Sequence, residues 1–142
     1  MTATGYFIED LKLGLAASFG KTVTEADIAM FAGVSGDTNP VHLDQVFAEQ
    51  TPFKGRIAHG MLSAGFISAV LGTKLPGPGA IYMSQTLRFK APVKIGDTVT
   101  ATCTVTEITP EKRRAILSTI CKVGDTVVIE GEAMVMVPSR GK

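Results

Sequence analysis

The spacing of apolar residues changes near the middle of the chain. Up to about Lys74 the segments carry helical signals, whereas the residues after Pro76 alternate between apolar and polar positions. A repeat near 3.6 residues is typical of a helix, and a repeat of two is typical of a half-buried strand. The sequence therefore predicts a mixed, mainly helical first half and a second half made of strands.

One strand and one capped helix are predicted at the start of the chain. Residues 16–23 alternate like a short strand, and Thr24 and Asp27 then occupy the two positions of a capping box. The apolar face of the following helix is formed by Ile28, Phe31 and Ala32. Because glycine favours the end of a helix, we expect Gly33 and Gly36 to stop it.

Two further helices are predicted before Pro76. Pro40 has no amide hydrogen and disfavours helical geometry in the preceding residue, so residues 37–42 are expected to be irregular. A short helix is expected at 44–50, and a longer apolar one at 59–73. A stripe of small side chains repeats every four residues along the longer helix, at Gly60, Ala64 and Ser68. Such a stripe lets other backbone or a ligand approach closely.

The second half predicts four strands with short connections. They are expected at 81–89, 98–106, 115–122 and 126–137. Connections of a few residues join antiparallel neighbours. The long helix is the large element able to cover the apolar face of such a sheet, so the predicted fold class is α+β.

Length and composition favour a single globular domain over residues 1–142. The chain has 142 residues, 45% apolar and 19% charged, with a formal net charge of +1. A nearly neutral charge argues against a nucleic-acid partner, and the low charge content favours an oligomer. The most apolar stretch, 57–75, carries His59 and Lys74, so we expect a buried helix rather than a membrane span.

The cysteines and the amino terminus favour a cytoplasmic protein. Cys103 and Cys121 both fall in strand-like segments and are expected to be buried free thiols. The first ten residues show no basic stretch followed by an apolar run, so no signal peptide is expected.

The segment from Gly36 to His42 is the first candidate for chemistry. Asp37 and His42 lie on a chain bent by Pro40, which allows the carboxylate and the imidazole to converge on one water molecule. The structural alternative is an Asx-turn, in which Asp37 or Asn39 caps local amides and His42 packs at a surface.

The second candidate is Gly60, at the expected start of the long helix. Its amide hydrogen would point outward from the positive end of the helix and could polarise a carbonyl oxygen of a ligand. The alternative is simple close packing of helix against sheet. His59 is interpreted as a capping or loop residue without assigned chemistry. Because the two histidines lack a ligand spacing such as HxxxH, no metal is expected, and no dinucleotide motif indicates a cofactor.

Together these segments resemble the MaoC-like hydratase family, specifically the short (R)-specific enoyl-CoA hydratases of the polyhydroxyalkanoate type. The family motif D-x-N-P-x-H is complete in Asp37, Asn39, Pro40 and His42. Further matches lie at Asp44, His59 to Met61, Ser68, Leu71 to Gly72, Leu75 to Gly77, Leu87 to Val93 and Gly96 to Asp97. The resemblance covers nearly the whole chain. It implies a hot-dog fold, in which a curved antiparallel sheet wraps around a central helix, and a homodimer.

The resemblance also implies roles for individual residues. Asp37 and His42 would activate one water for addition to a trans-2-enoyl-CoA, and the Gly60 amide would be the oxyanion donor. Asn39 and Ser68 would be supporting groups, and Leu71 would limit the depth of an acyl pocket. Coenzyme A is part of the substrate, so no separate cofactor is implied. The alternatives are a 3-hydroxyacyl-thioester dehydratase that acts on acyl-carrier protein or another hydroxyacyl-CoA, a hot-dog thioesterase and a non-catalytic binding subunit.

Overall fold

The computed structural model describes residues 4–141, which form one antiparallel sheet and four α-helices. The strands are β1 (Ala16–Thr22), β2 (Ile81–Gln85), β3 (Arg88–Phe89), β4 (Thr98–Thr109), β5 (Arg114–Val123) and β6 (Thr126–Met136). The helices are α1 (Glu25–Ser35), α2 (Pro40–Leu43), α3 (Gln45–Glu49) and α4 (Gly60–Thr73). Two short 3-10 turns, Ile8–Asp10 and Pro110–Lys112, complete the elements.

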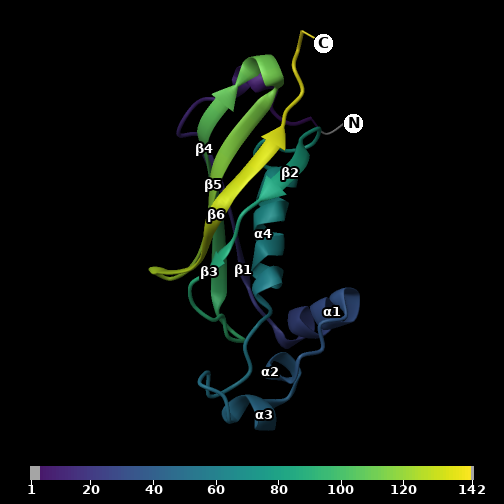
Figure 1. Ribbon diagram of the computed structural model, residues 1–142, viewed down its shortest axis with the longest axis vertical. Helices are drawn as coiled ribbons and strands as arrows, with labels where there is room; N and C mark the ends of the chain where they lie inside the picture. The colour runs from purple at the N-terminus through teal and green to yellow at the C-terminus, as the bar shows by residue number, and fades with distance from the viewer. Residues whose placement is uncertain (1–3, 142) are drawn as a thin grey trace.

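The sheet curves along α4, which runs lengthwise against it, while α1, α2 and α3 gather at one end (Figure 1). The strand order is β1-β4-β5-β6-β2, with β3 also paired to β6. The apolar residues of α4 are buried against alternating residues of β4 and β5. Burial of these two faces removes a large apolar area from water, which is the main force holding helix to sheet. The prediction of an α+β fold with a curved antiparallel sheet around a central helix is confirmed.

The first half differs from the prediction near Pro40. The capping box of Thr24 and Asp27 is present at the start of α1, but α1 passes through Gly33 and ends at Gly36, whose φ is 81°. The segment expected to be irregular up to His42 instead forms the one-turn helix α2 from Pro40. That part of the prediction is wrong, because proline is tolerated at the first position of a helix, where the missing amide would have had no intrahelical partner.

The predicted strand at 81–89 is divided into β2 and β3. Both pair with β6, but the register shifts within β2, and the chain crosses close to Gly131 between the two strands. A side chain at Gly131 would overlap the carbonyl oxygen of Thr86, so glycine permits this close approach. The even apolar alternation of 81–89 gave no sign of the break.

The two cysteines are buried free thiols, as predicted. Burial raises the pKa of Cys103 to about 12 and that of Cys121 to about 11. Because the thiolate is the reactive form, these side chains behave as small core residues. Within residues 4–141, none of the helices combines the length and the apolar character that crossing a membrane requires.

Candidate active site

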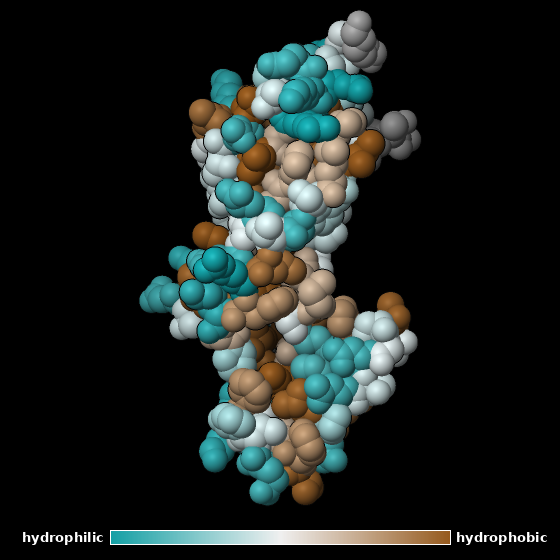
Figure 2. Space-filling view, in the orientation of Figure 1, coloured by the Kyte–Doolittle hydropathy of each residue, from teal (hydrophilic) through white to brown (hydrophobic). Residues whose placement is uncertain are grey.

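A cavity of about 400 Å³ opens at the amino-terminal end of α4. Its volume lies within the range of small-molecule sites, roughly 300–1,000 Å³. The apolar wall includes Phe53, Ile57, Phe89, Val93, Val128 and Ile129. The polar groups that face it come from the loop after α1, from α2 and from the start of α4. In Figure 2, brown side chains line a hollow below the middle of the molecule, at the level of these elements in Figure 1.

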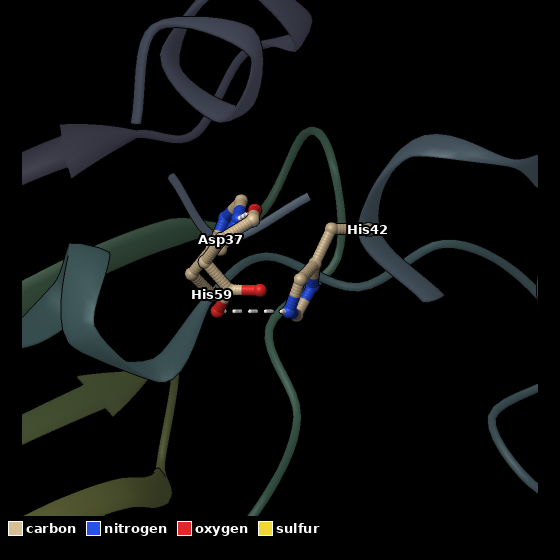
Figure 3. A group of neighbouring side chains, drawn as sticks. All are labelled: Asp37, His42 and His59. Carbon is tan, nitrogen blue, oxygen red and sulfur yellow. Dashed lines mark hydrogen bonds and ion pairs between the residues drawn. The ribbon is translucent and has the colours of Figure 1, made fainter. Parts of the chain in front are cut away.

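Asp37 lies in the loop between α1 and α2, and its side chain is 50% exposed. The left-handed Gly36 ends α1 and turns the chain toward the cavity. The backbone N–H of Asn39 donates to Asp37 Oδ1 at 3.2 Å. The other carboxylate oxygen, Oδ2, faces His42 Nε2 at 4.0 Å (Figure 3). That distance is too long for a direct hydrogen bond, but it accommodates a water about 2.8 Å from each atom.

His42 is held by its backbone and by one ring nitrogen. Asn39 Oδ1 accepts from the Val41 amide and so caps α2, the turn that carries His42. His42 Nδ1 lies 2.8 Å from the carbonyl oxygen of Ile57. A carbonyl only accepts, so Nδ1 carries the proton and Nε2, which faces Asp37, is the nitrogen free to exchange one.

Arg56 anchors the same turn from outside the cavity. Its Nε donates to the His42 carbonyl oxygen at 2.6 Å, and its two terminal nitrogens donate to both carboxylate oxygens of Glu25 at 2.6 and 2.7 Å. Hydrogen bonds from Arg56 lower the pKa of Glu25. This two-pronged contact ties α2 to the start of α1, and the motif spacing gave no sign of it.

Gly60 is the first residue of α4, so its backbone N–H is one of the donors at the helix start that have no acceptor within the helix. The amide has no acceptor among residues 4–141, and Gly60 lines the cavity. A Cβ added here would lie 2.6 Å from two ring carbons of Phe89. Glycine therefore keeps the helix start open beside this aromatic ring, and the amide is placed to donate to an oxygen in the cavity.

His59 makes contacts that the sequence did not indicate. It is 1% exposed and holds the N-cap position of α4, yet its side chain caps no helix amide. Its Nε2 lies 2.9 Å from the carbonyl oxygen of Asp37, and its ring stacks on that of His42 with centroids 3.8 Å apart and planes 28° apart. The expectation of a capping residue missed these contacts, because they join segments distant in sequence.

Two of the expected site residues lie away from the cavity. Ser68 is exposed on α4, about 12 Å along the helix from Gly60 at 1.5 Å per residue. Leu71 is 2% exposed in the core. Instead, Ser63 lines the cavity with a buried hydroxyl that has no partner among the described residues. It follows Gly60 by three positions, a spacing that keeps both on one face. The roles expected for Ser68 and Leu71 stay predictions.

The side chains of Asp37, His42 and His59 each offer a ligand atom within 4.8 Å of the others. Two of the four ring nitrogens already face carbonyl oxygens. The two rings stack nearly face to face, and lone pairs that lie in nearly parallel ring planes do not converge readily on one ion. The arrangement is therefore better suited to proton transfer than to a tetrahedral metal centre.

Comparison with known proteins assigns this geometry to a family. The family model described as "MaoC like domain" matches residues 12–130, which include every residue of the site. The chain belongs to the MaoC-like family. The resemblance stated from the motif is therefore confirmed.

Two curated relatives and a solved structure extend over almost the whole MaoC-like chain. An (R)-specific enoyl-CoA hydratase from Rhodospirillum rubrum is 64% identical, covering 96% of this chain and 94% of its own. A 3-hydroxybutyryl-CoA dehydratase from Methylorubrum extorquens is 54% identical, covering 94% and 85%. The structure of an (R)-hydratase from A. caviae involved in PHA biosynthesis superimposes with a TM-score of 0.89 at 44% identity, covering 92% and 99%. The prediction of a hydro-lyase is confirmed by these relatives.

Proposed function

We propose that this chain hydrates trans-2-enoyl-CoA thioesters reversibly to (R)-3-hydroxyacyl-CoA. The observation that carries the proposal is the pair formed by Asp37 Oδ2 and His42 Nε2, 4.0 Å apart at a cavity that also contains the free amide of Gly60. The names of the two curated relatives support the same substrate class. No separate cofactor or metal enters the proposal.

The Gly60 amide would act on the thioester carbonyl. Carbon C3 of an enoyl thioester becomes electrophilic when this carbonyl is polarised, and negative charge gathers on its oxygen as water adds. A helix start provides a fixed donor and a positive partial charge there without reorganisation. An oxygen bound to Gly60 would place the acyl chain against the apolar wall formed by Val128 and Ile129.

Asp37 and His42 would hold and activate the water between them. The reaction starts with Asp37 as a carboxylate and with a proton on both ring nitrogens of His42. Asp37 takes a proton from the water as the new C3–O bond forms, and His42 delivers its Nε2 proton to C2 as the double bond is consumed. The proton on Asp37 then passes through the next water to His42 Nε2, which restores both groups. Because one water couples the two groups, the roles of base and acid can be exchanged between them. Dehydration follows the same path in reverse, so one site serves both directions.

The deciding experiment follows the loss of enoyl absorbance with crotonyl-CoA and then determines the configuration of the 3-hydroxy product. We expect rapid hydration and an (R) product, which is the configuration in the names of the R. rubrum and A. caviae relatives. An (S) product, or no hydration, contradicts the proposal. Free thiol released from an acyl-CoA would indicate a thioesterase, and a strong preference for acyl-carrier protein would indicate the carrier-protein dehydratase.

We infer also that the chain forms a homodimer through the edge of β2. The two free edges of the sheet are β1 and β2, and the exposed residues of β1 are small: Ala16, Ser18, Gly20 and Thr22. On β2, Ile81, Tyr82 and Met83 are 58%, 41% and 41% exposed. Apolar side chains at a free sheet edge favour pairing with another strand. Brown and tan patches cover the middle of the molecule in Figure 2, near α4, β2 and β3 in Figure 1.

A further inference from the structure

A buried imidazole lies where the three parts of the site meet. His59 precedes Gly60, contacts the loop of Asp37 through a hydrogen bond and contacts α2 through the ring of His42. It is 1% exposed, so its position is determined by packing rather than by solvent. In Figure 3 its ring lies directly beside Asp37 and His42. One side chain therefore touches both members of the pair and adjoins the amide donor.

The hydrogen bond of His59 determines the tautomer of its ring. Its partner is the Asp37 carbonyl oxygen at 2.9 Å, which only accepts, so Nε2 carries the proton. That proton is committed to the backbone and is not aimed at the Asp37 carboxylate. Nδ1 is buried and has no partner among residues 4–141. The ring is thus arranged to hold its neighbours rather than to pass a proton between them.

The Asp37 loop otherwise relies on short-range contacts. The Asp37 amide donates to Ser35 Oγ at 3.1 Å, and its Oδ1 accepts from Asn39, both two residues away. Such contacts fix the shape of the loop but not its distance from His42. The bond from His59 joins this loop to α4, and the stacked ring supports one face of the His42 imidazole.

We propose that His59 is a positioning residue that sets the separation between the Asp37 carboxylate and His42 Nε2. The proposal rests on the hydration reaction proposed above. A misplacement of about 1 Å between reacting groups reduces rates roughly 100-fold. Since the proton of His59 is bonded to a backbone carbonyl oxygen and not to a reacting group, its loss should lower kcat through geometry and leave substrate affinity nearly intact.

Two substitutions separate the contacts of His59. His59→Phe keeps a ring for stacking but removes the donor, whereas His59→Gln keeps an N–H donor but removes the ring. For each we expect kcat with crotonyl-CoA to fall about 10- to 100-fold, and KM to change by less than about threefold. Phe31→Leu is the matched control, because Phe31 packs against His59 with ring centroids 4.8 Å apart. It should lower stability in urea while kcat stays near that of the wild type.

The tautomer provides a second test that needs no activity. The chain has two histidines, so the imidazole nitrogens can be assigned by 15N NMR with His42→Gln as the reference. We expect Nε2–H for His59 and Nδ1–H for His42. An Nδ1–H signal for His59 would overturn the proposal even if His59→Phe failed to fold.

The remaining outcomes separate this proposal from the proposed function. A wild-type protein without hydratase activity overturns the function, while the tautomers still test the contact of His59. An active wild type with near-normal kcat in both His59 variants overturns the positioning role alone. Equal losses of kcat in His59→Phe and Phe31→Leu would show a general packing effect and would also overturn it.

Discussion

Asp37 and His42 differ in how far solvent reaches their side chains. Asp37 is half exposed, so water reaches its carboxylate, whereas His42 is 8% exposed with one nitrogen bound to a carbonyl. A group with one fixed nitrogen presents the other in a constant direction. In the proposed mechanism, this combination lets a water molecule enter on the Asp37 side and be held on the His42 side.

Removing either titratable group should abolish most of the activity without unfolding the chain. We expect Asp37→Asn and His42→Gln each to lower kcat for crotonyl-CoA by about 10²–10⁴-fold, because each acid–base member contributes that much. Circular dichroism and urea unfolding provide the check on folding. If both variants keep near-full rates, the assignment of the pair is wrong.

The role of the Gly60 N–H can be tested separately from the steric effect of adding a side chain at this position. In a Phe89→Ala background the aromatic ring that would clash with a Cβ at position 60 is absent. The double variant Phe89→Ala/Gly60→Ala should therefore have the same rate as Phe89→Ala alone. Gly60→Pro in the same background removes the N–H, and we expect kcat to fall about 10²–10³-fold. His59 has φ −61° and ψ 134°, which suits a following proline. Equal rates in the two double variants would exclude the amide as the oxyanion donor.

Leu71 carries the prediction about chain length. Leu71→Ala should destabilise the protein by about 2–5 kcal/mol, because a buried side chain is lost. The role expected from the motif predicts a shift in preference from four-carbon toward six- and eight-carbon enoyl-CoAs, whereas the position of Leu71 in the core, away from the cavity, predicts an unchanged profile. Val70→Ala, also fully buried on α4, is the control for stability alone. An unchanged profile of rates would remove Leu71 from the acyl pocket.

At the scale of elements, α2 is too short to hold itself in place. A helix of one turn gains little from its own hydrogen bonds, since helix nucleation is costly. The Asn39 cap, the Arg56 guanidinium and the bond from His42 to the Ile57 carbonyl provide the stabilisation. The site therefore depends on contacts between elements more than on helix propensity.

The contact of Glu25 with Arg56 predicts a pH dependence of stability. The pKa of Glu25 is lowered from 4.5 by hydrogen bonds from Arg56. The stabilisation is therefore present above about pH 4.5 and is lost as the pH falls through the lowered value. We expect Glu25→Gln to be less stable than the wild type at pH 7, with the difference shrinking near pH 3.

Urea unfolding at several pH values measures this difference. Glu111→Gln is the control, because Glu111 makes no ion pair within the part of the chain that the structure describes. A difference that stays constant down to pH 3 would show that the Glu25 charge is not responsible.

At the scale of the molecule, the two free edges of the sheet differ: the exposed residues of β1 are small, whereas those of β2 include large apolar side chains. β2 presents apolar side chains although it is a free edge strand, and α4 presents Met61 at 53% exposure beside the cavity. A second copy that pairs through β2 would cover the exposed apolar side chains of that strand, and β3, which follows β2 along β6, carries Phe89 of the cavity wall. The cavity would then lie next to the interface.

The dimer predicts a specific response to charge on β2. Met83→Lys should convert a dimer into a monomer in analytical ultracentrifugation, because a buried unpaired ammonium is costly. Val34→Lys is the control, since Val34 lies on α1 and is 87% exposed. A wild-type monomer, or a dimer that survives Met83→Lys and is lost in Val34→Lys, would exclude the β2 edge as the interface.

The sequence by itself determined most of the elements, their order and the family. Alternation of threonine with apolar residues in 98–106 predicts a half-buried strand, and the motif of Asp37 and His42 carries the family resemblance. These features are local, so they can be recognised along the chain. The tertiary structure decided the break between β2 and β3, the Arg56 contacts and the stacking of His59 on His42. Each of these depends on atoms brought together from distant segments, and the linear pattern contains no distance between them.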